Sequence, residues 1–193
     1  WEVGRSIYWS YVDAHTLKAI ELIKAKKYTD AITHLTKALE YPENLEVGKP
    51  THDEKSAMIF YYLGLAYDEM GDLKKTKKYF EKSVKDENGT RMDDLSFFQG
   101  KALKRLGDND KANQLFNALI TKGSELRNSG TENTLIAVEE ASIGNKKQVS
   151  MAYYLEGLGH LGHGDKEKAN LLFAKAIEEY DNNLWARRMA APL

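Results

Sequence analysis

The chain of 193 residues contains no cysteine, only three prolines and no long apolar run. Without cysteine it can have no disulfide framework, no thiolate zinc site and no cysteine nucleophile. Its apolar runs are far shorter than the about 20 residues needed to cross a bilayer, so we expect no membrane partner. Lys and Arg number 28 against 29 Asp and Glu, a net charge of −1. Because chains that bind nucleic acid are normally basic, we expect no nucleic-acid partner either.

Motifs of catalysis are also missing. The sequence has no Gly-x-Ser-x-Gly elbow, P-loop, dinucleotide fingerprint or His-Glu-x-x-His pair. We therefore expect no enzyme and no cofactor. His160 and His163 lie three residues apart, but zinc needs three or four ligands and no third is evident nearby. We expect structural roles for both, isolated positions for His15, His34 and His52, and no metal site.

The feature that the chain does have is an internal repeat around two glycines. Three segments share a glycine seven residues before a Gly-Asp pair: 60–72 (FYYLGLAYDEMGD), 96–108 (SFFQGKALKRLGD) and 153–165 (YYLEGLGHLGHGD). Apolar residues recur at helical spacing on both sides of each Gly-Asp pair. The repeat therefore predicts pairs of antiparallel helices joined by tight turns.

Each glycine of the repeat has a predicted task. The glycine of the Gly-Asp pair, such as Gly71, can adopt the left-handed conformation that ends a helix. The aspartate after it, such as Asp72, can cap the next helix. Gly64, Gly100 and Gly157 stand inside the first helices, where glycine costs about 1 kcal/mol. We predict that they let the two helix backbones of each pair approach closely.

These residues resemble the tetratricopeptide repeat family. Its pattern is an aromatic residue, two others, Leu-Gly, two others and Tyr, with Ala-x3-Phe beginning nine residues later. The best match consists of Phe60, Leu63, Gly64, Tyr67, Thr76 and Phe80. The resemblance implies an all-α fold: a right-handed α–α superhelix of about four helix pairs in a single domain, 1–193. The repeats are predicted at about 8–41, 54–87, 92–123 and 147–181.

Two insertions interrupt the repeats, at about 42–53 and 124–146. The first reads as a loop because Pro42, Gly48 and Pro50 punctuate it. The middle of the second, TLIAVEEAS, could form a short helix, an extended segment or both. The insertions also resemble the C-terminal array of large bacterial tetratricopeptide proteins that carry an upstream β-rich domain. With Trp1 as the first residue, this favours a fragment of a longer chain; the compartment stays open, with the cytoplasm favoured.

The resemblance implies a concave groove lined by the first helix of each pair. The repeat register places eight candidate binding residues there: Tyr61, Leu65, Phe97, Lys101, Lys104, Arg105, Tyr154 and Leu158. Tyr61, Phe97 and Tyr154 would form an aromatic ladder beside a basic patch, and Asp68 and Glu69 an acidic one. Such a surface suits an extended peptide. Alternatively, the aromatic rings pack against the insertions and the charges form a solvated helix face.

We interpret the chain as a non-catalytic interaction or scaffold module. Its partner would be a protein or peptide segment, or the upstream domain of the same chain. A second interpretation makes it an accessory domain of a carbohydrate-active enzyme whose catalytic part lies upstream. A third makes it a homo-oligomerisation module. Fold alone does not choose among these functions.

Overall fold

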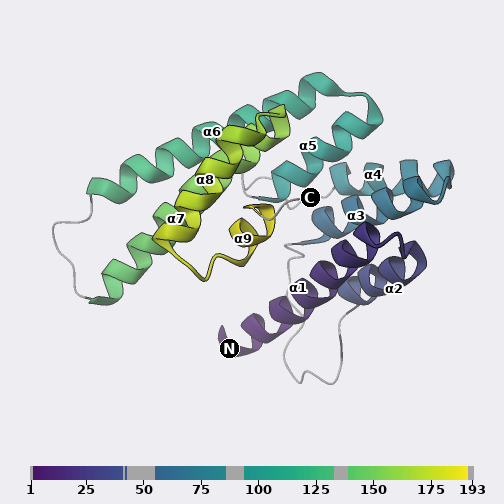
Figure 1. The fold of residues 1–193 in the computed structure, drawn as a ribbon, viewed down its shortest axis with the longest axis horizontal. Coiled ribbons are helices and arrows are strands. Elements are labelled where there is room, and N and C mark those ends of the chain that lie inside the picture. The colour runs from purple at the N-terminus through teal and green to yellow at the C-terminus, as the bar shows by residue number, and fades with distance from the viewer. Residues whose placement is uncertain (1, 41, 43–54, 86–93, 133–138, 191–193) are drawn as a thin grey trace. The chain divides into compact units, whose positions relative to one another are not determined.

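The computed structural model describes residues 2–40, 42, 55–85, 94–132 and 139–190 (Figure 1). Every element in these ranges is helical, as the repeat predicts. The helices are α1 (Glu2–Lys24), α2 (Tyr28–Leu39), α3 (Ser56–Glu69), α4 (Leu73–Lys85), α5 (Leu95–Leu106), α6 (Asn109–Glu132), α7 (Glu139–His163), α8 (Lys166–Glu179) and α9 (Leu184–Ala190). The all-α class is therefore confirmed. None of these helices is both long enough and apolar enough to cross a membrane.

The helices belong to two compact units. One comprises 1–91 and 101–108, and the other 92–100 and 109–193, so that α5 contributes to both. In the first unit α1 packs on α2, α2 on α3 and α3 on α4. In the second, α7 packs on both α6 and α8, and α9 on α8. Helices that follow one another along the chain are thus neighbours within each unit.

Tight turns join the helices of three pairs. Gly71, Gly107 and Gly164 have φ values of +76°, +89° and +93°, the left-handed conformation expected at the end of a helix. The Asp72 carboxylate accepts a hydrogen bond of 3.0 Å from the backbone N–H of Lys75. Asp165 caps α8 in the same way, at 3.1 Å from Lys168 N. The predicted roles of glycine and aspartate are confirmed at these positions.

The turn between α1 and α2 has no glycine. Lys26 adopts the left-handed conformation there, with φ +58°. The backbone N–H of Lys27 still donates to Leu22 O at 2.8 Å, so the helix end keeps its hydrogen bonding. This conformation is energetically unfavourable for lysine because its Cβ disfavours positive φ.

The glycines inside the first helices pack against phenylalanine. A Cβ placed on Gly64 would lie 2.5 Å from the Phe80 ring. In the same way, a Cβ on Gly100 would lie 2.5 Å from the Phe116 ring, and one on Gly157 would lie 2.5 Å from the Phe173 ring. We predicted that these glycines bring two backbones together. In the structure, a buried ring of the second helix fills the space instead.

The stretch 124–146 extends two helices. Residues 124–132 continue α6 and residues 139–146 begin α7. The two long helices pack closely, because a Cβ on Gly159 would lie 2.6 Å from Phe116 O, and one on Gly123 2.6 Å from Ala152 O. Residues 133–138, which hold most of the apolar centre of this insertion, and nearly all of the first insertion lie outside the described residues.

Candidate functional site

Half of the eight predicted binding residues are buried. The exposed fractions of Tyr61, Phe97, Tyr154 and Leu158 are 6, 4, 1 and 0%. The other four are accessible: Arg105 is exposed, and Leu65, Lys101 and Lys104 are half-buried. The expected ladder of exposed aromatic rings is therefore wrong, whereas the basic side chains do reach the surface.

The three buried rings occupy equivalent places in their repeats. Each lies three residues before the packing glycine and contacts the phenylalanine that covers that glycine. The ring centroids are 5.9 Å apart for Tyr61 with Phe80, 6.2 Å for Phe97 with Phe116 and 6.1 Å for Tyr154 with Phe173. Residues i and i+3 share a helix face, which explains why ring and glycine meet the same partner. The rings thus form part of the packing within each helix pair.

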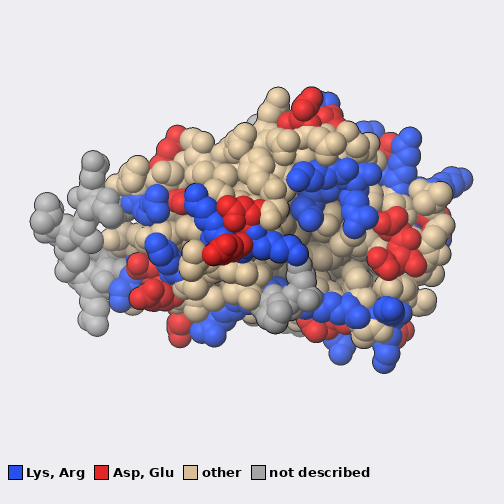
Figure 2. Space-filling model, turned by 45° about the horizontal axis from the view of Figure 1, so that its top comes forward, with Lys and Arg blue, Asp and Glu red and all other residues tan. Residues whose placement is uncertain are grey.

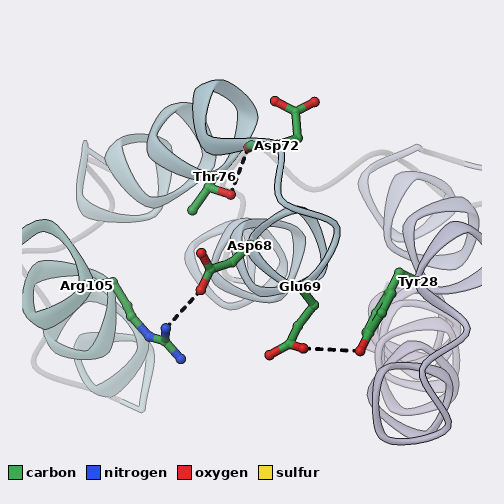
Figure 3. Close-up of polar contacts among 6 residues, drawn as sticks. All are labelled: Tyr28, Asp68, Glu69, Asp72, Thr76 and Arg105. Carbon is green, nitrogen blue, oxygen red and sulfur yellow. Dashed lines mark hydrogen bonds and ion pairs between the residues drawn. The ribbon is translucent and has the colours of Figure 1, made fainter.

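Two acidic side chains in the last turn of α3 contact neighbouring helices of the first unit. Asp68 accepts a hydrogen bond of 2.9 Å from Arg105 Nη1, on α5. The neighbouring Glu69 accepts one of 3.1 Å from the Tyr28 hydroxyl, on α2. Figure 3 shows the two carboxylates reaching toward different helices. Adjacent acids thus tie the end of α3 to a neighbour on either side.

Asp72 does not belong to this polar surface. Its carboxylate points away from Asp68 and Glu69 (Figure 3), and its backbone carbonyl accepts a bond of 2.9 Å from the Thr76 hydroxyl. The backbone N–H of Lys75 lowers the Asp72 pKa by stabilising the charged form. Asp72 therefore serves as a helix cap.

Desolvation raises the pKa values of two tyrosines near this polar surface. It raises the pKa of Tyr61 to about 12, with Arg105 acting in the opposite direction. Desolvation, followed by hydrogen bonding to Glu69, raises the pKa of Tyr28. Both hydroxyls therefore stay protonated at neutral pH, so that they can donate hydrogen bonds but supply no base.

We call the "α3–α5 surface" the group Leu65, Asp68, Lys101, Lys104 and Arg105, all within the first unit. Lys101, Lys104 and Arg105 lie at i, i+3 and i+4 on α5 and so share one side of that helix. On the face drawn in Figure 2, Lys and Arg side chains lie interspersed with Asp and Glu. The surface combines an apolar side chain, three cations and an acid, a set suited to binding rather than to proton transfer.

The histidines differ from expectation in one case. His15 on α1 and His34 on α2 are not isolated, since their Nδ1 atoms lie 2.9 Å apart. The contact arises because α1 packs on α2, and the pattern within either helix does not reveal it. His163 Nε2 lies 2.8 Å from the Asn117 amide oxygen and its ring meets Phe116 edge-on. Among the described residues, no three His, Cys, Asp or Glu side chains are placed to hold a metal.

Comparison with known proteins agrees with this architecture. Two models of the tetratricopeptide repeat family match, one over residues 59–85 and one over residues 99–122. The first match covers most of α3 and all of α4, and the second starts within α5 and continues into α6. The chain therefore contains tetratricopeptide repeats, and its repeats support a role as a protein-interaction or scaffold module.

Three solved structures resemble the chain at low sequence identity. The TPR2AB-domain:pHSP90-complex of yeast Sti1 shares 16% identity, with 94% of this chain and 82% of that one covered and a TM-score of 0.36. MamA 41-end from Desulfovibrio magneticus RS-1 shares 16%, with 93% and 81% covered and a TM-score of 0.32. YrrB, described as a TPR protein with an unusual peptide-binding site, shares 22%, with 90% and 89% covered and a TM-score of 0.32. A search of curated proteins returns no match.

Proposed function

We propose that the chain is a non-catalytic scaffold that binds an extended protein segment on the α3–α5 surface. The segment belongs either to another protein or to the same, longer bacterial polypeptide. The observation that carries the proposal is Arg105, an exposed cation held in place by Asp68. Its side chain is 49% exposed, so it can bind a partner while already oriented.

Three features of the surface support a peptide partner. Orientation of Arg105 by Asp68 reduces the side-chain entropy lost on binding. A guanidinium can bind a carboxylate or a backbone carbonyl of the segment. Leu65, half-buried on α3, adds apolar area. The buried Tyr61 supports the surface from below, because it packs on Phe80 and does not reach solvent.

The test is selection of a random peptide library displayed on phage against the whole chain. Recovered peptides are then measured by fluorescence anisotropy against three variants. We expect Arg105→Ala and the pair Lys101→Glu with Lys104→Glu to weaken binding at least tenfold. Lys166→Ala, an exposed lysine on α8, is the control and should change nothing. Peptides that bind all variants equally, or a library without enrichment, would sink the proposal.

A further inference from the structure

Helix α4 carries an unusual concentration of one charge. Six of its 13 residues are lysines and only one is acidic, Glu81. All six lysines are exposed: Lys74, Lys75, Lys77, Lys78, Lys82 and Lys85. Since the whole chain has a net charge of −1, this helix concentrates positive charge locally. It belongs to the first unit but shares no residue with the α3–α5 surface.

Four of these lysines form a continuous row. Lys74, Lys78, Lys82 and Lys85 follow at intervals of four, four and three residues, so they share one face of the helix. We call this row the lysine strip. Ion pairs on α4 involve the other two lysines: Lys75 with Asp72 at 3.3 Å and Lys77 with Glu81 at 4.0 Å. Within the part of the chain that the structure describes, no carboxylate pairs with the strip.

Aromatic rings lie beneath the strip. Lys82 Nζ stands 5.2 Å from the Phe60 centroid and 5.8 Å from that of Tyr79, and Lys78 Nζ 5.9 Å from Tyr79. Tyr79 in turn stacks on Tyr67, with centroids 5.4 Å apart and planes at 2°. Cation–π attraction holds the ammonium groups over these rings. Because the rings face lysines and each other, they do not form an open platform for stacking bases, which disfavours a single-stranded nucleic acid.

The spacing of the strip suits an extended polypeptide. A step of four residues along a helix advances about 6 Å. Side chains on the same side of an extended strand recur every two residues, about 6.6 Å. Flexible lysine side chains absorb the difference. We infer that the lysine strip binds an acidic, extended protein segment with carboxylates at alternate positions.

The probe is a synthetic 12-residue peptide of alternating Glu and Ala, acetylated and amidated so that it has no terminal carboxylate. Its binding to the whole chain is measured by fluorescence anisotropy at low and at physiological salt. We expect saturable binding that weakens as salt rises. The pair Lys78→Glu with Lys82→Glu should lower affinity at least tenfold, and Lys78→Gln with Lys82→Gln should lower it less.

A control and a comparison variant carry the same change of net charge. Lys146→Glu with Lys166→Glu alters exposed lysines of α7 and α8. Lys101→Glu with Lys104→Glu alters the α3–α5 surface. The α7–α8 control should keep most of the affinity, the α3–α5 comparison variant should lose less than the strip variant, and circular dichroism should show every variant folded. Equal losses for the strip and the α7–α8 pair would mean that only net charge matters, which overturns the inference.

The remaining outcomes separate the strip from the proposed function. A larger loss in the Lys101 and Lys104 pair would assign acidic peptides to the α3–α5 surface; it overturns the inference while leaving the proposed function intact. Tighter binding of a 12-nucleotide oligothymidine, or of phosphatidylserine vesicles, than of the peptide would overturn the choice of partner. Absence of peptide binding at low salt would overturn the strip as a binding surface.

Discussion

The ring of Phe80 occupies the space beside Gly64 that the Cβ of any other residue would need. The distance from such a Cβ to Phe80 Cε1 is 2.5 Å, shorter than real Cβ contacts. Phe80 is 2% exposed, so its ring is packed inside the protein and moving it would disturb its neighbours. The glycine of the repeat is therefore required by a side chain of the partner helix.

Replacing Gly64 by alanine should destabilise the protein. Alanine favours the helix by about 1 kcal/mol, but forcing a methyl group into a packed core costs about 1–3 kcal/mol, and the second effect should win. We expect a net loss of about 1 kcal/mol, and at most about 2 kcal/mol, in urea unfolding followed by circular dichroism. Gly144→Ala is the control, since a Cβ there meets nothing within 4 Å and should stabilise α7. Adding Phe80→Leu to Gly64→Ala should restore part of the loss; a Gly64→Ala variant as stable as the parent would contradict the packing argument.

The turn at Lys26 should accept glycine with a gain in stability. Its φ of +58° costs an L-residue about 1–2 kcal/mol, while glycine loses part of that gain through unfolded-chain entropy. We expect Lys26→Gly to raise the free energy of unfolding by about 0.5–1 kcal/mol. The mirror experiment is Gly71→Ala, at φ +76° with open space around it, which should lower stability by about 1 kcal/mol. If both variants shift stability in the same direction, backbone strain is not the cause.

The contact between His15 and His34 should make the first unit sensitive to acid. Burial, then the charges of His34 and Lys37, lower the pKa of His15 below its ordinary 6.5. The unfolded chain therefore takes up a proton more readily than the folded one. This contribution to stability is complete above pH 6.5 and is lost as the pH falls through the folded pKa. Thermal unfolding between pH 7.5 and 5 should show the loss, and His15→Gln should show a smaller one.

The second unit contains a buried acid whose ionisation should cost stability. Glu156 is 7% exposed, and burial raises its pKa although Arg127, at 3.3 Å, acts the other way. A raised folded pKa means that stability is complete below the ordinary pKa and falls as the pH rises through the folded one. Glu156→Gln should therefore stabilise the protein at pH 7 and have little effect at pH 4. Unfolding curves at the two pH values check the sign.

Arg127 should contribute to stability mainly through its ion pair with Glu156. Removing it leaves a buried charge without its partner, so Arg127→Ala should cost about 1–3 kcal/mol at pH 7. In the Glu156→Gln background the same substitution should cost less. A double-mutant cycle measures the difference; equal costs in both backgrounds would show that Arg127 acts through its contact with the Tyr153 ring, 5.4 Å away, instead.

Much of the local structure follows from spacing along the chain. Helical periodicity predicts the paired helices, and the Gly-Asp dipeptides predict their turns, because positive φ at Gly71 and a carboxylate cap at Asp72 are local requirements. The prediction that aromatic rings line the groove is wrong for a geometric reason. Tyr61 shares a helix face with Gly64, three residues further on. Gly64 marks that face as the one that packs on the second helix, so Tyr61 does not face the groove.

By itself, the sequence determined the fold class, the helix pairs and the left-handed glycine turns that join them. Those depend on backbone conformation and on contacts a few residues apart. Only the tertiary structure decided that the Tyr61 ring contacts Phe80, that His15 meets His34 and that Arg105 is held by Asp68. These are contacts between helices, and they depend on how each helix is rotated against its neighbour, which no pattern within one helix specifies.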